Sequence, residues 1–180
     1  NDPTLMFVNS GMVQFKNVNV KVDYSPTSRI SAFARAGYFR EERDNAKRVT
    51  VVNAPQISEA NDTTWKSVSG GVRILLPDAS DLQARVFADF NRFHSNFLAV
   101  PNLVTRAIAR RTLDQVVPTT GVGGMVQWSR GFGARNYFTA GTDWRWVDGD
   151  SEENAMDAVT GTTVVTRRVS GGVQRSLGFF

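Results

Sequence analysis

The chain has no cysteine and only one histidine, His94, among its 180 residues. Without cysteine it cannot form a disulfide framework, a thiolate nucleophile or a cysteine-bound zinc site. A Ser-His-Asp triad would have to use His94, and no serine or acid stands at an informative spacing from it. The sequence therefore predicts a protein that is not an enzyme and has no cofactor, and we interpret His94 as a membrane-interface residue.

Long hydrophobic runs are also absent. The longest uninterrupted apolar runs are only a few residues, as at residues 74–76, whereas a membrane-spanning helix needs about 20. Helical spans are therefore excluded. Strands could still cross a bilayer, because a strand with a period of two shows only half of its residues to lipid.

A block of positive charge is missing as well. The formal net charge is +4, but the Lys and Arg residues are scattered singly and no nucleic-acid-binding motif accompanies them. We therefore expect no nucleic-acid partner.

What the sequence does contain is alternation of apolar and polar residues, the pattern of a strand with one apolar face. Each strand is expected to reach roughly ten residues or more, the length that crosses a bilayer at a tilt. About seven such strands are expected, near residues 18–24, 30–39, 68–76, 82–90, 122–128, 138–146 and 169–179.

The connections between these stretches alternate in length. Short connections rich in Pro, Gly, Ser, Asn and Asp take turns with long polar ones, as the hairpins of a membrane barrel do with periplasmic turns and extracellular loops. The sequence predicts an all-β, antiparallel transmembrane β-barrel, with residues 1–180 forming a single barrel segment. Short connections are expected at 25–29, 77–81 and about 130–136, and long ones at about 43–63, 97–119 and 148–163.

Aromatic residues gather near both ends of the expected strands. Rings are favoured at the two headgroup levels of a membrane, although the same rings could fill the core of a soluble β domain. The predicted interface aromatics are Tyr24, Trp128 and Tyr137 at the short-turn end, and Tyr38, Trp144 and Trp146 at the loop end.

Charged residues alternate with the apolar ones and would point into one lumen. A small eight-stranded barrel must pack and pair such charges, whereas a wide barrel can leave them against water or a plug. The segment 103–111 is basic and compatible with a helix, and it could attract an anionic ligand or lipopolysaccharide phosphates. The predicted substrate-binding residues are Arg73, Arg85, Asp89, Asp143 and Arg145 in the lumen, and Arg106, Arg110 and Arg111 in that loop.

One acidic stretch is a weak candidate for a metal site. Asp148, Asp150 and Glu152 could offer oxygen ligands to calcium, but the central Gly and the bidentate Glu of an EF-hand loop are missing. We interpret the stretch as a solvated acidic loop and predict no metal.

The glycine pairs at 70–71, 123–124 and 171–172 are expected to admit a bend, a plug or a neighbouring aromatic ring.

Three stretches carry a family resemblance: Arg35 to Arg43, Gly121 to Trp128, and above all Ser170 to Phe180. In the amino-acid sequence of these stretches the chain resembles the TonB-dependent receptors of the bacterial outer membrane. The resemblance implies a 22-stranded barrel closed by an N-terminal plug, with energised uptake of a scarce nutrient such as an iron-siderophore complex. It also implies outer-membrane lipid, lipopolysaccharide and TonB as partners, TonB being reached through an N-terminal region.

The chain departs from that family in having no TonB box, no plug and too few strands to close such a barrel. It also lacks an N-terminal signal peptide. We therefore expect a segment from the N-terminal half of a longer parent barrel. The alternatives are a non-energised porin, a small eight-stranded structural barrel and, more distantly, a soluble lipid-binding barrel.

Overall fold

The computed structural model describes residues 11–45, 59–99, 110–157 and 163–180, and within these it contains strands and no helix. The expected all-β class is thereby confirmed, as is the expectation of seven strands. These are β1 (Met12–Thr27), β2 (Ile30–Asp44), β3 (Ala60–Leu75), β4 (Asp81–Ala99), β5 (Arg110–Phe132), β6 (Asn136–Met156) and β7 (Thr163–Phe179).

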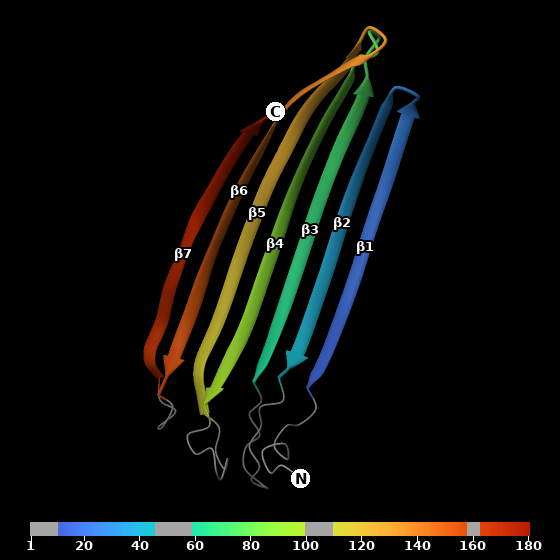
Figure 1. Ribbon diagram of the computed structural model, residues 1–180. Helices are drawn as coiled ribbons and strands as arrows, with labels where there is room; N and C mark the ends of the chain where they lie inside the picture. The colour runs from blue at the N-terminus through green and yellow to red at the C-terminus, as the bar shows by residue number, and fades with distance from the viewer. Residues whose placement is uncertain (1–10, 46–58, 100–109, 158–162) are drawn as a thin grey trace, which may run out of the picture.

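The strands form one antiparallel sheet in sequence order, β1 to β7 (Figure 1). Each strand pairs with the one before it and the one after it, while β1 and β7 lie at opposite sides of the sheet and do not contact each other. The described sheet is therefore open, with one free edge on each side.

The short connections all lie at one end of the sheet, and the strand ends that lead into the long connections lie at the other (Figure 1). The long connections predicted from the sequence contain too many residues. β5 begins at Arg110 rather than near residue 120, and β6 continues to Met156. The reason is that ladder hydrogen bonds join backbone groups, so pairing continues where the side chains have become polar.

The β3–β4 turn shows how the short connections are held. Ala79 has a positive φ of 61°, and Leu76 N–H donates to the Ser80 carbonyl at 2.8 Å. The Asp78 carboxylate accepts from the Ser80 N–H at 3.1 Å and from its hydroxyl at 2.6 Å. The side-chain bond is the main reason that the pKa of Asp78 lies below its ordinary value.

The sheet has almost no hydrophobic core of its own. Among the described residues, Leu98 is the only buried hydrophobic one, while many large apolar side chains are exposed. None of the described residues forms a helix long and apolar enough to cross a membrane.

Candidate functional site

The strand register separates the side chains into two faces. Opposite residues in neighbouring strands share a face, and successive residues of one strand point to opposite faces. One row across the sheet is apolar: Val20, Ala36, Val68, Ala88, Val122 and Trp146. The adjacent row, on the other face, is largely polar or small: Asn19, Gly37, Ser67, Asp89, Gly121, Val147 and Gln174.

We call the uncharged part of the first face the apolar band. It covers the halves of β1 to β6 nearest the short turns, and several of its members are more than half exposed. On β7 the same face continues with Leu177 and Phe179 but carries Arg175. The band consists of the even-numbered residues of 18–24, 32–38, 68–74, 82–90, 122–128 and 138–146.

The same face changes character abruptly beyond the band, toward the long connections. In each of β1 to β4 the next residue on this face is a cation, and all four cations are exposed. We call these four residues, Lys16, Arg40, Lys66 and Arg92, the cationic row. None was singled out from the sequence, although each stands two positions beyond the last apolar residue of its alternating stretch, which is the signal that could have found them.

The opposite face brings together part of the predicted substrate-binding set. Arg85 and Asp143 both flank Met125, on β4 and β6, and Arg145 follows Asp143 on the same face. Asp89 lies two positions beyond Arg85 on the same face of β4, after Phe87, and accepts a hydrogen bond from Trp65 Nε1 at 3.3 Å. These four residues therefore lie on one polar face near the middle of the sheet.

The remaining predicted substrate-binding residues lie away from this group. Arg73 shares the polar face but lies close to the β3–β4 turn, where it pairs with Asp81 at 2.6 Å. Arg110 and Arg111 begin β5 at the opposite end of the sheet, so the expected helix-compatible loop is wrong for these two residues. Arg106 lies outside the described residues.

Aromatic rings cover glycines on neighbouring strands. A Cβ on Gly71 would lie 2.6 Å from Phe33 Cε1, and one on Gly123 would lie 2.6 Å from Phe87 Cζ. On the apolar face Gly124 lies against Trp144, whose Nε1 would be 3.0 Å from such a Cβ. At Gly71, Gly123 and Gly124 the missing side chain therefore leaves room for an aromatic ring of a neighbouring strand.

Five of the six predicted interface aromatics share the face of the apolar band. They are Tyr24, Tyr38, Trp128, Trp144 and Trp146. Tyr137 pairs with Gly131 in the register, which places it on the polar face.

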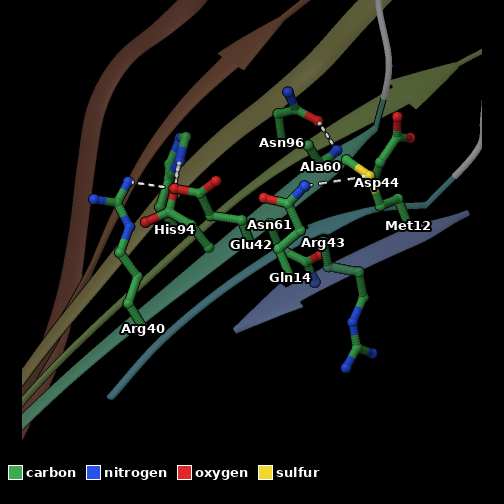
Figure 2. Close-up of a pocket in the computed structure, with 11 residues that line it drawn as sticks. Met12, Gln14, Arg40, Glu42, Arg43, Asp44, Ala60, Asn61, His94 and Asn96 are labelled. Carbon is green, nitrogen blue, oxygen red and sulfur yellow. Dashed lines mark hydrogen bonds and ion pairs between the residues drawn. The ribbon is translucent and has the colours of Figure 1, made fainter. Parts of the chain in front are cut away.

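A hollow of about 320 Å³ lies at the loop end of β1 to β4, beyond the band. Figure 2 shows Arg40 joined to Glu42, an ion pair of 2.6 Å, and Asn96 accepting a hydrogen bond from the Ala60 N–H. His94 also lines it. Most of the residues that line the hollow are polar, and they include charges of both signs, unlike the band beside it.

His94 links three strands at this end of the sheet. Its Nδ1 lies 2.9 Å from Asp62 of β3, and its Nε2 lies 2.7 Å from Asp114 of β5. Partial burial is the largest single influence and lowers the pKa of His94, but the hydrogen bonds to the two carboxylates, with their charges, outweigh it and raise that pKa overall. Sequence spacing could not reveal these partners, because they are 32 and 20 residues away.

The acidic stretch 148–153 is a strand and not a loop, which corrects the expectation. Asp148, Asp150 and Glu152 belong to β6 and share one face. Within the described ranges, no group of three or more His, Cys, Asp or Glu side chains is arranged to hold a metal ion.

Comparison with known proteins gives no family. No protein-family model matches the chain, and no solved structure matches it. A stretch of 48 residues, 25% of the chain, is 52% identical to the alanine–tRNA ligases of Polaromonas naphthalenivorans strain CJ2, Granulibacter bethesdensis and Jannaschia sp. strain CCS1. The match covers only 6%, 6% and 5% of those proteins, and so supports neither ligase activity nor transport.

Proposed function

We propose that the chain is a wall segment of a transmembrane β-barrel in a bacterial outer membrane, and that this barrel belongs to a TonB-dependent receptor. The observation that carries the membrane part is the apolar band: a broad, exposed, uncharged surface on a sheet in which only one described hydrophobic residue is buried. Burial of apolar surface is the main driving force of folding in water. Lipid against the band would supply that burial.

The dimensions of the band support this proposal. It is seven to nine residues long in each strand, or about 24 to 31 Å along the strand at about 3.4 Å per residue. Strand tilt shortens this height toward the roughly 25 Å of the apolar belt of an outer-membrane barrel. Because backbone groups at an open edge cannot remain in lipid, further strands would have to pair with β1 and β7.

The transport part rests on the resemblance of the strand sequences and on the polar face. Facing a lumen, Arg85, Asp89, Asp143 and Arg145 would contact a charged nutrient chelate or a plug. The wall itself would perform no chemistry and hold no cofactor. Energy would come from TonB through a plug that the described sheet does not include.

A non-energised porin is the second candidate, favoured by the half-exposed polar face, which suits a water-filled lumen. In a barrel of eight strands Arg85, Asp143 and Arg145 would instead have to fill the interior together with the side chains opposite them. Uptake that depends on TonB separates the receptor from the porin.

Single cysteines test the membrane proposal directly, because the chain has none of its own. Spin labels at Val20→Cys and Val86→Cys should be accessible to oxygen, which partitions into lipid, and shielded from a water-soluble nickel relaxant. Labels at the polar-face neighbours Asn19→Cys and Arg85→Cys should show the reverse. Equal access to the nickel reagent on both faces would exclude a membrane wall.

A further inference from the structure

We propose that the cationic row is a binding surface for the phosphate groups of anionic lipids, in the leaflet on the side of the long connections. The proposal rests on the proposed membrane role of the apolar band and names the residues that would contact the lipid phosphates. It concerns the border of the band and not the polar face.

Position is the first argument. Lys16, Arg40, Lys66 and Arg92 follow Val18, Tyr38, Val68 and Phe90 directly on the same face. If lipid tails cover the band, the next layer outward is the headgroup layer. Lys16, Arg40 and Arg92 therefore lie one register row beyond the band, at phosphate depth. Lys66 lies opposite Tyr38 and Phe90, level with the last row of the band, and would reach the phosphates by extending its long side chain outward.

Spacing is the second argument. Lys16 lies opposite Arg40, while Arg40 and Arg92 both lie opposite Thr64 in the register. At about 4.8 Å between strands, the row from β1 to β4 is about 14 Å wide, enough to contact more than one phosphate. Lys66 lies on the band side of Thr64, between the two arginines.

The two lysines of the row are open to an anion, whereas the two arginines already have carboxylate contacts. Arg40 pairs with Glu42 at 2.6 Å, and Arg92 lies 3.9 Å from Asp62, a long contact. Both acids lie on the loop side of the cations, farther from the band. Within the described ranges, Lys16 and Lys66 have no carboxylate partner.

The chain offers a matched control for this surface. Lys16 and Arg40 face each other on β1 and β2, and so do Lys21 and Arg35 on the same two strands. The second pair lies on the polar face. The double variants K16Q/R40Q and K21Q/R35Q therefore remove the same charges from the same strands on opposite faces.

The experiment titrates short-chain phosphatidic acid into the full protein that contains these strands, held in phosphatidylcholine nanodiscs, and counts bound lipid by mass spectrometry. At about 1 kcal/mol, or about fivefold, for each basic residue near a membrane surface, K16Q/R40Q should weaken binding about 25-fold. K21Q/R35Q should stay within about twofold of the parent, and the charge-conserving K16R/R40K should keep most of the affinity.

Equal weakening in both double variants would overturn the proposal, because net charge alone would explain it. Displacement of the lipid by equimolar inorganic phosphate would also overturn it, in favour of a free-anion site. Insertion into phosphatidylcholine alone reports the proposed membrane role separately. Protein that inserts but binds phosphatidic acid no better than phosphatidylcholine refutes only the lipid site, whereas protein that does not insert refutes both.

Discussion

The two halves of the face that carries the apolar band belong to the same strands, yet their side chains differ in character. Toward the short turns the apolar band carries no charge across β1 to β6, whereas toward the long connections the same face carries the cationic row, His94 and several acids. The backbone ladder continues without interruption from β2 to β3 through both halves. The difference therefore lies in the side chains and not in the secondary structure, as we expect if one half faces lipid and the other water.

The largest expected effect comes from placing a charge in the band. Val86 is 60% exposed at the centre of the band. If the band faces lipid as proposed, Val86→Arg should destabilise the protein in a bilayer by about 2 to 4 kcal/mol. Unfolding by urea in lipid vesicles measures this. Ser69→Arg, on the polar face of the neighbouring strand, is the control, and an equal loss in both variants would contradict the assignment of the faces.

The glycine contacts predict the next largest effect. Gly123→Ala would place a Cβ 2.6 Å from Phe87 Cζ and 2.7 Å from the Trp144 carbonyl oxygen. We expect a loss of about 1 to 3 kcal/mol from overpacking. Gly172→Ala, with nothing within 4 Å of its Cβ, should change the free energy of unfolding far less; similar losses would show that the ring contact does not matter.

The His94 cluster predicts a pH dependence confined to the loop-side half. Because its pKa is raised in the folded protein, the protonated ring stabilises the β3–β5 ends below its ordinary pKa, and this stabilisation is lost as pH rises through the raised value. Amide protection factors near Asp62 and Asp114, which correct for the intrinsic rise of hydrogen exchange with pH, should fall across that window. The fall should disappear in His94→Gln, and its persistence there would assign it to another group.

The smallest effect is expected from neutralising an acid in the loop-side half. Arg40 and Glu42 are about half exposed, at 47% and 52% of their side chains. Glu42→Gln should change stability by less than about 0.5 kcal/mol. If the urea midpoint of Glu42→Gln shifts as far as that of Val86→Arg, the proposed difference between the two halves of the face is wrong.

Local sequence was a good guide wherever apolar and polar residues alternate. It predicted seven antiparallel strands and three short turns, because a period of two with Gly, Pro, Asp and Asn between stretches is a local signal. It placed the strand ends poorly: β5 begins at Arg110 and β6 reaches Met156. Polar stretches there have no hydrophobic period, so only the ladder shows that they are strands.

Among site residues, the sequence placed Arg85, Asp89, Asp143 and Arg145 on a common face, because alternate residues of a strand point to the same side. It could not bring His94 to Asp62 and Asp114, nor place Tyr137 away from the other aromatics. Those placements depend on how neighbouring strands are aligned.

The sequence by itself determined the class of structure, the order of strands and turns, and the two chemically distinct faces, because alternation needs no knowledge of distant residues. Only the tertiary structure decided which residues of different strands meet: the width of the apolar band, the four cations along its border and the strands joined by His94. A shift of one residue in register would exchange the faces of a strand. This long-range alignment is therefore what turns a local pattern into a continuous surface.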